Sequence, residues 1–131
     1  MDNKTVVLRY YEEVWNQRNT DALSEIWAPD FRRYLSPRTS PLNAAEQLAR
    51  MQGLQTAFPD ISMTVLDIVT EGDKICVRVQ SDCTHKGDFM GKSATGKTIK
   101  AYAFEMMRLK DNQIVEHWGG PDIADMLRQI N

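Results

Sequence analysis

The sequence predicts an α+β fold in which helices pack on one face of a curved antiparallel sheet. Three observations carry this prediction. Apolar residues recur at helical spacing up to about residue 59, whereas from residue 61 they alternate as in strands, and from residue 123 the helical spacing returns. Helices and strands that are segregated along a chain are typical of α+β domains.

The first predicted helix begins at Asp2 or Asn3, either of which can cap it, and runs to about Gln17. Its apolar residues fit helical spacing and are Val6, Val7, Tyr10, Tyr11, Val14 and Trp15. Thr20 can cap a shorter second helix, which Pro29 ends because proline cannot continue a helix.

Residues 32–42 contain prolines, serines and a threonine and predict a loop. Asn43 followed by Glu46 resembles a capping box and starts a third helix. That helix ends at Pro59. Strands are predicted at 61–69, 74–84, 98–109 and 113–118, with turns at 71–73 and 110–112.

The strand at 74–84 alternates cleanly, with Val77, Val79, Ser81 and Cys83 on one face. The opposite face is polar apart from Cys76, so the first face is the buried one. Continued to His85, the same alternation predicts an inward-pointing imidazole near a pocket.

The segment 113–122 combines a strand with chemically useful side chains. In a regular strand Ile114, Glu116 and Trp118 share one face, while Val115 and His117 share the other. Two glycines and a proline then break the strand, and Asp122 follows at the start of the terminal helix. An aspartate there is either a buried acid or base beside the indole, or a helix N-cap.

Composition limits the classes of function. The chain has 131 residues, which fits one domain spanning 1–131. A net charge of -2 without a basic block argues against nucleic acid as a partner, and no apolar run is long enough to span a membrane. The N-terminal segment does not resemble a signal peptide, so we expect a cytoplasmic protein. The two cysteines, Cys76 and Cys83, face opposite sides of one strand and should not pair, and no metal-ligand spacing is present.

Several short motifs occur together and in order along nearly the whole chain. They are Tyr10-Tyr11-Glu12-Glu13-Val14-Trp15-Asn16, Pro29-Asp30-Phe31, Phe58-Pro59-Asp60, Thr84-His85-x-Gly87-x-Phe89-x-Gly91, Thr95-Gly96-Lys97, Arg108-Leu109, Ile114-x-Glu116-His117-Trp118, Asp122 and Leu127-x-Gln129. In this pattern the chain resembles the SnoaL-like polyketide cyclases, also called predicted ester cyclases, within the NTF2-like group of folds.

The resemblance implies an NTF2-like (cystatin-like) α+β cone with a deep pocket for a hydrophobic small molecule, and a homodimer built through the sheets. It also implies an intramolecular aldol condensation with no metal or organic cofactor. Asp122 matches the position of the family's acid/base aspartate. The sequence departs from the family's pattern at two places, and both bear on the identity of the substrate more than on the fold. Arg33 and Tyr34 stand where family members often place a histidine, and residues 119–121 are less bulky than usual in the family.

An aldol cyclisation needs a base and then an acid, and one carboxyl group with a raised pKa can serve as both. Burial against Trp118 would raise the pKa of Asp122, whereas capping a helix would lower it. His85 is a second catalytic candidate, either binding a substrate carbonyl or serving only as a core histidine. His117, opposite Trp118 in the alternation, is expected to be packed or exposed rather than catalytic.

Six side chains are candidates for binding the substrate: Trp15, Tyr34, Phe104, Glu105, Glu116 and Trp118. Most aromatic candidates could equally be plain core. Glu105 has small neighbours on its strand face, which leaves room for a ligand. Glu116 is either a second pocket carboxylate or an ion-pair partner of Arg108 or Arg78.

Two other classes of function remain open from the sequence. One is an isomerase like ketosteroid isomerase, with Tyr10 or Tyr11 acting beside Asp122, or a hydrolase using the same pocket. The other is a non-catalytic module that binds a ligand or a partner protein. Fold alone does not choose among these.

Overall fold

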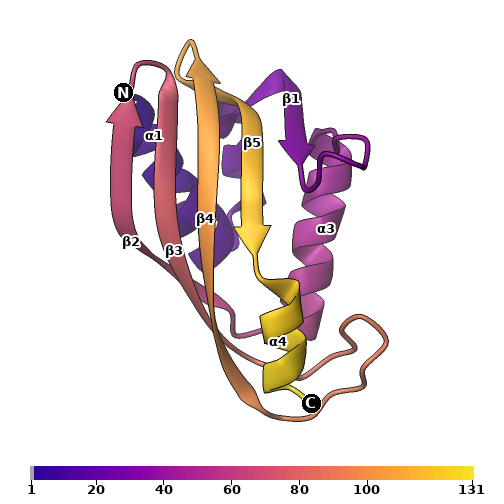
Figure 1. The fold of residues 1–131 in the computed structure, drawn as a ribbon. Coiled ribbons are helices and arrows are strands. Elements are labelled where there is room, and N and C mark those ends of the chain that lie inside the picture. The colour runs from indigo at the N-terminus through magenta and orange to yellow at the C-terminus, as the bar shows by residue number, and fades with distance from the viewer. Residues whose placement is uncertain (1) are drawn as a thin grey trace.

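A single five-stranded sheet forms the front of the molecule in the computed structural model, which describes residues 2–131 (Figure 1). The strands are β1 Trp27–Tyr34, β2 Ser62–Glu71, β3 Lys74–Thr84, β4 Thr98–Lys110 and β5 Gln113–Pro121, in the spatial order β1-β5-β4-β3-β2. Neighbouring strands are antiparallel except that β1 runs parallel to β5. The α+β fold is confirmed, with a mixed sheet in place of the fully antiparallel one that we expected.

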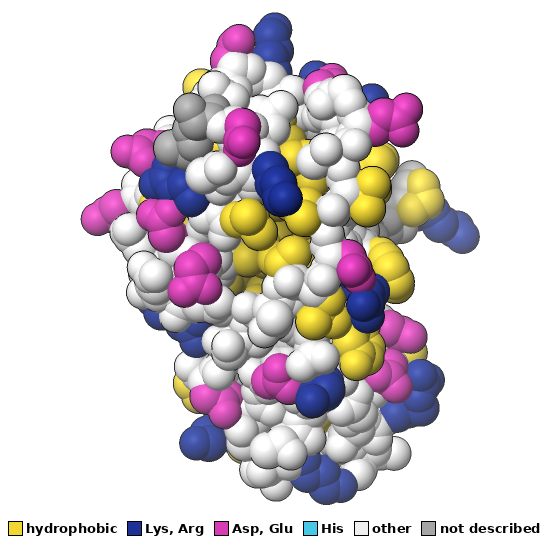
Figure 2. All heavy atoms as spheres, turned by 90° about the vertical axis from the view of Figure 1, so that its left-hand side faces the viewer, with side chains coloured by type: hydrophobic (Ala, Val, Ile, Leu, Met, Phe, Trp, Pro, Cys, Tyr) yellow, Lys and Arg dark blue, Asp and Glu magenta, His cyan; other side chains and the backbone are white. Residues whose placement is uncertain are grey.

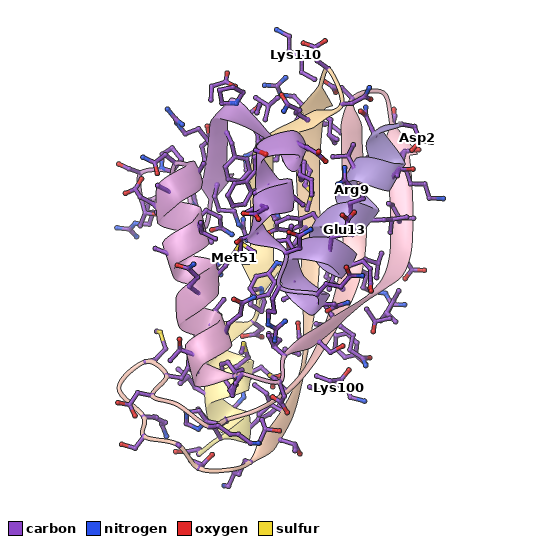
Figure 3. The ribbon with its side chains drawn as sticks, turned by 180° about the vertical axis from the view of Figure 1, so that it is seen from behind. Asp2, Arg9, Glu13, Met51, Lys100 and Lys110 are labelled. Carbon is purple, nitrogen blue, oxygen red and sulfur yellow. The ribbon has the colours of Figure 1, made fainter. Side chains whose placement is uncertain are left out.

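The helices cover one face of this sheet. Helix α1 Asn3–Arg9 continues directly into the π-helical segment η1 Tyr10–Asn16, and Asp2 caps it by accepting the Thr5 N–H at 2.8 Å. Helix α3 Ala44–Ala57 starts with the predicted capping box. Figure 3 shows α3 and the first helix lying next to each other over the back of the sheet, with Met51 between them.

The predicted second helix is shorter than expected, and a strand takes its place. A 3₁₀ turn, η2 Thr20–Ala22, and α2 Leu23–Ile26 are followed at once by β1. Pro29 lies inside that strand, where the pairing with β5 is irregular between Trp27 and Arg32. An edge strand tolerates a residue without an N–H at such an irregularity. Residues 32–34 are therefore paired backbone and not the predicted loop, and Arg33 lies beside His117 in the register.

The predicted buried face of β3 is confirmed, and His85 beyond its end is fully buried. The structure also shows which face of β4 is buried. Ala101 and Ala103 face the helices, whereas Tyr102 and Phe104 are 51% and 72% exposed on the other face. Glu105 therefore points toward the helices.

The short helix α4 Ile123–Gln129 follows β5 directly and closes the lower end of the molecule as seen in Figure 1. Seen from the β2 side, hydrophobic side chains gather in the middle of the surface among charged ones (Figure 2). A groove on this side runs between η1 and β2, with Leu8 and Val65 in its wall. Among residues 2–131, no helix has the length and hydropathy that crossing a membrane requires.

Candidate active site

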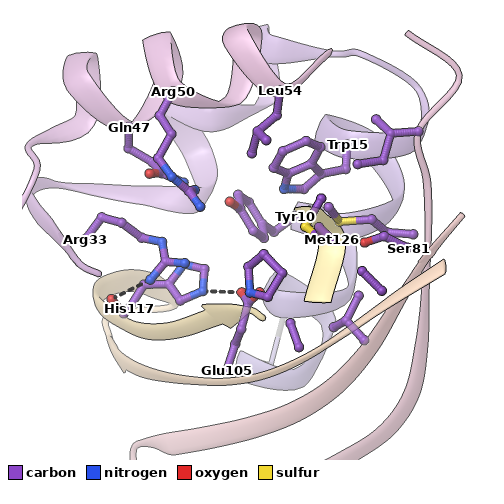
Figure 4. Close-up of a pocket in the computed structure, with 16 residues that line it drawn as sticks. Tyr10, Trp15, Arg33, Gln47, Arg50, Leu54, Ser81, Glu105, His117 and Met126 are labelled. Atoms are coloured by element: carbon purple, nitrogen blue, oxygen red, sulfur yellow. Dashed lines mark hydrogen bonds and ion pairs between the residues drawn. The ribbon is translucent and has the colours of Figure 1, made fainter. Parts of the chain in front are cut away.

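A pocket opens between η1, α3 and the inner face of β3, β4 and β5 (Figure 4). The cavity inside it is small, about 40 Å³. Its wall is largely apolar, with contributions from Leu54, Ile61, Met63, Val79, Ala101, Ala103 and Met126. Its polar or amphipathic side chains are Tyr10, Trp15, Arg33, Gln47, Arg50, Ser81, Glu105 and His117. A mostly apolar pocket with a few convergent polar groups is the usual form of a small-molecule site.

Glu105 and His117 form a buried pair at the floor of the pocket. The His117 Nε2 atom lies 2.5 Å from Oε1 of Glu105, and the Tyr11 hydroxyl donates to the same oxygen at 2.7 Å. The side chains of His117 and Glu105 are only 1% and 10% exposed. One carboxylate oxygen thus accepts two hydrogen bonds from two different elements, β5 and η1.

Electrostatics keep Glu105 ionised. Burial on its own raises the pKa of this carboxyl, but the attraction and hydrogen bond of His117, the charge of Arg33 and the bond from Tyr11 outweigh it and lower the pKa to about 2. For His117, burial first and then the charge of Arg33 lower the pKa below the ordinary 6.5, against the opposing effect of Glu105. At neutral pH we therefore assign an ionised Glu105 beside a neutral His117.

This charge state fixes the tautomer of His117. An ionised carboxylate only accepts hydrogen bonds, so Nε2 must carry the ring proton and donate it to Glu105. The Nδ1 atom is then left with its lone pair, and it is buried without a hydrogen-bond partner among residues 2–131. A neutral imidazole that is oriented by a carboxylate and has one unpaired nitrogen is suited to accept a proton.

Arg33 places a cation against this pair. Its side chain is buried, and one guanidinium nitrogen donates to the backbone oxygens of Tyr34 and His117 at 3.1 and 3.2 Å. The Nε atom of Arg33 has no partner within the described chain, nor does the Oε1 atom of the buried Gln47. Buried polar atoms are normally paired, so three unpaired ones around one pocket, counting Nδ1 of His117, indicate a site built for a polar ligand.

Tyr10 supplies an aromatic wall and a hydroxyl. Its ring meets that of His117 edge-on, with centroids 5.8 Å apart and an interplanar angle of 86°. The hydroxyl donates to the Met51 sulfur at 3.6 Å, which is a weak acceptor. Burial, followed by the charge of Glu105, raises the pKa of Tyr10, so the hydroxyl keeps its proton at neutral pH.

Of the residues predicted from the sequence, Trp15 and Glu105 line the pocket. Asp122 does not: its side chain is exposed and accepts the Asp125 N–H at 3.0 Å, capping α4. His85 is buried, as predicted, but lies outside the pocket, where its Nδ1 accepts the Thr95 N–H at 3.2 Å.

The other four predicted binding residues lie outside the pocket because they point to the other side of the sheet or its edge. Tyr34 stacks on Trp118 with ring centroids 5.6 Å apart, and Phe104 is exposed. Glu116 pairs with Arg108 at 2.5 Å, which is the ion-pair alternative that the sequence left open. Trp118 consequently does not wall the pocket, and the exposed Asp122 carboxylate is not buried against it.

Sequence reasoning did not select His117, Arg33 or Arg50 for the site. The signal for His117 was present in part, because Glu105 was a pocket candidate and the two strands form a tight hairpin. The signal for Arg33 was hidden by the loop predicted at its position. Arg50 lies on α3 three residues after Gln47, so helical spacing sends both toward the same side.

The protein-family model of the SnoaL-like polyketide cyclases matches residues 5–130. The chain belongs to the SnoaL-like polyketide cyclase family. Its fold is accordingly that of this NTF2-like family, as the sequence resemblance implied.

Solved structures similar to this SnoaL-like chain include IdmH from Streptomyces antibioticus, named as a candidate polyketide cyclase, with 32% identity over 99% of both chains and a TM-score of 0.89. A candidate polyketide cyclase from Acidithiobacillus ferrooxidans shares 26% identity over 98% of this chain and 96% of its own, with a TM-score of 0.81. AclR from Streptomyces galilaeus, named as a candidate hydroxylase, shares 28% identity over 98% and 94% of the two chains, with a TM-score of 0.86. The comparison with curated proteins gave no match.

Proposed function

We propose that this chain catalyses the intramolecular aldol cyclisation of a polyketide in the pocket, with His117 as the general base. The observation that carries the proposal is the buried pair of His117 and Glu105, in which Nδ1 of a neutral imidazole has no hydrogen-bond partner in the part of the chain that the structure describes. Membership of the SnoaL-like cyclase family supports the class of reaction.

The reaction needs only proton transfers and one carbon–carbon bond. His117 removes a proton from a carbon next to a carbonyl group, which gives an enolate. The enolate carbon attacks a second carbonyl carbon of the same molecule, and the resulting alkoxide oxygen takes the proton back from His117. The product is an isomer of the substrate, so the balanced step consumes no oxidant, reductant or other co-reactant, and we propose that it runs without a cofactor.

Three neighbours assist His117 in this proposal. Glu105 holds the ring by its Nε2–H and stabilises the imidazolium that forms, as the aspartate does in a Ser-His-Asp triad. The guanidinium of Arg33 lies beside the pair, and the Tyr10 hydroxyl donates to the Met51 sulfur, which is a weak acceptor. Both are donors available to the oxygen on which negative charge develops.

Asp122 remains the alternative acid/base residue, because it matches the family's aspartate by position. Its neighbours Pro121 and Ile123 both line an outer groove at the mouth of the pocket, which would have to deliver the substrate to it. The exposed capping geometry favours the structural role, and substitution of each residue separates the two assignments.

The reaction class is tested by incubating the protein with aromatic polyketide acids and esters that carry a methylene between two carbonyl groups and a third carbonyl within reach of ring closure. Mass spectrometry and NMR should find a cyclic product of unchanged mass. A shifted double bond without a ring would support an isomerase, loss of an alcohol would support a hydrolase, and a gain of oxygen would support the reaction that the name of AclR implies. Binding without any conversion would support the non-catalytic reading.

A further inference from the structure

Two arginines enter the pocket, and neither forms an ion pair with a carboxylate among residues 2–131. Arg33 comes from β1 and Arg50 from α3. In Figure 4 both side chains extend toward the space above the Glu105–His117 pair. A site that holds two cations so close together requires a physical reason.

Arg33 is the more deeply buried of the two arginines. Its side chain is 2% exposed, and its hydrogen bonds go to two neutral backbone carbonyl oxygens. Its Nε atom has no hydrogen-bond partner among residues 2–131. An unpaired buried charge is costly, and guanidinium groups in protein interiors are normally matched by a carboxylate or a phosphate. The pocket therefore offers an unmet donor on a buried cation.

Arg50 faces the same space from α3. It lines both the pocket and an outer groove that shares Leu54 and Pro121 with it, so it lies at the entrance. Burial and the like charge of Arg33 lower the pKa of Arg50, which places the two guanidinium groups within each other's field. The outer groove also contains the exposed Asp88, but no ion pair joins it to Arg50.

The balance of charge favours an anionic ligand. The charged side chains lining the pocket are Arg33, Arg50 and Glu105, because His117 is neutral and Tyr10 keeps its proton. The only carboxylate among them already accepts bonds from His117 and Tyr11 through one oxygen. One positive charge is left over inside a mostly apolar pocket.

We propose that Arg33 and Arg50 form a subsite for a carboxylate on the substrate, which binds with its apolar body against Trp15 and the walls of β3 and β4. This inference rests on the proposed function for the reaction but names the substrate class independently: a polyketide acid in place of a neutral ester. Two guanidinium groups, one from β1 and one from α3, can each donate to an oxygen of one carboxylate.

The subsite would also position the reacting carbon. A carboxylate held between β1 and α3 fixes one end of the substrate beside the Glu105–His117 pair, so that the rest extends along the apolar wall of the pocket. Binding the carboxylate in this way would hold the reacting carbon in a fixed orientation relative to His117. It accounts for an arginine at position 33, where family members often have a histidine.

The test compares a matched pair of non-reactive probes, 2-naphthoate and 2-naphthamide, which differ in charge but hardly in shape. Isothermal titration calorimetry at neutral pH should find that the acid binds at least about tenfold more tightly, since only the acid forms charge-assisted hydrogen bonds with the two guanidinium groups. Arg50→Met should abolish that preference. Arg32→Met is the matched control, because Arg32 is the exposed neighbour on the same strand, and it should change nothing.

A second variant guards against misfolding at the buried position. Arg33→Lys keeps the charge but removes the planar fork, and it should retain a folded circular dichroism spectrum while the preference for naphthoate falls. Equal affinities for acid and amide, absence of binding by both, or an unchanged preference in Arg50→Met would overturn the subsite. Thermal stabilisation by inorganic phosphate alone as large as that by naphthoate would overturn the assignment to a carboxylate on an apolar body. None of these outcomes depends on turnover, so the cyclase proposal stands or falls separately.

Discussion

His117 and Glu105 meet diagonally across the hairpin of β4 and β5 and not as directly opposed residues. The register places Met107 opposite His117 and Gly119 opposite Glu105, so the 2.5 Å contact between Nε2 and Oε1 joins side chains two positions apart on one face. Diagonal neighbours on a sheet face are within reach of long side chains. The pair therefore depends on the backbone of β5 at Gly119 as well as on its own two residues.

Gly119 should be intolerant of a side chain. Its φ is +93°, and an added Cβ would lie 2.2 Å from the Phe104 carbonyl oxygen. Gly119→Ala should lower the free energy of unfolding by about 2 kcal/mol or more through strain and displacement of β4. The matched control is Gly53→Ala on α3, where nothing lies within 4 Å and alanine should stabilise by about 0.5–1 kcal/mol. Urea unfolding measures both, and a Gly119→Ala protein as stable as the wild type would contradict the close approach.

Glu105 should make the stability of the protein depend on pH in the acid range. Its pKa is lowered from 4.5 to about 2 in the folded chain, so its ionised form stabilises the fold. That contribution is complete above about pH 4.5 and is lost as the pH falls toward 2. The difference in unfolding free energy between the wild type and Glu105→Gln should therefore shrink as the pH falls from 4.5 toward 2. A difference that is constant over this range would mean that Glu105 is not held ionised by His117, Tyr11 and Arg33.

Asp122 should behave as a helix cap. Asparagine caps a helix about as well as aspartate, whereas alanine does not. Asp122→Asn should therefore keep both turnover and stability, and Asp122→Ala should lose about 1 kcal/mol of unfolding free energy with little change in turnover. Loss of turnover in Asp122→Asn with stability intact would restore Asp122 as the acid/base residue that the family position implies.

We predict a homodimer built through the outer face of the sheet. That face exposes Val69, Tyr102 and Phe104, which are 66%, 51% and 72% exposed on β2 and β4. Apolar residues gathered on one sheet face are typically covered by a partner, and a second copy is the commonest one. Sedimentation at micromolar concentration should find a dimer that Phe104→Glu disrupts, while Met90→Glu on a loop leaves it intact. A monomeric wild type would contradict the prediction.

Much of the fold was predictable because local signals agreed with the global structure. Asp2 and Asn43 cap the helices that they were expected to cap, and the alternation of β3 assigned its buried face correctly. The failure at β1 has a physical cause. Pro29 normally ends a helix and disfavours a strand, and only the irregular edge pairing with β5 makes room for it. That pairing joins segments about 85 residues apart, which local patterns do not reveal.

The site was less predictable because one bulge reverses the face of β5. In a regular strand Ile114, Glu116 and Trp118 share a face, but the register shifts between the pair Leu109–Ile114 and the pair Arg108–Glu116. The extra residue, Val115, turns the strand so that Ile114 and His117 both face the core while Glu116 faces outward. Alternation alone therefore placed His117 on the face opposite Ile114, although both side chains face the core.

The most direct test of the central claim is proton abstraction by His117. Proton NMR can follow exchange of the acidic methylene hydrogens of a β-dicarbonyl polyketide probe in deuterated buffer, with no ring closure required. His117→Gln keeps a donor for Glu105 but removes the basic nitrogen, and the exchange rate should fall by roughly two to four orders of magnitude. In the wild type the rate should rise with pH and level off with an apparent pKa below 6.5, because burial and Arg33 lower the pKa of His117. Wild-type exchange in a folded His117→Gln protein, or a plateau reached only well above pH 6.5, would contradict the assignment of His117 as the base.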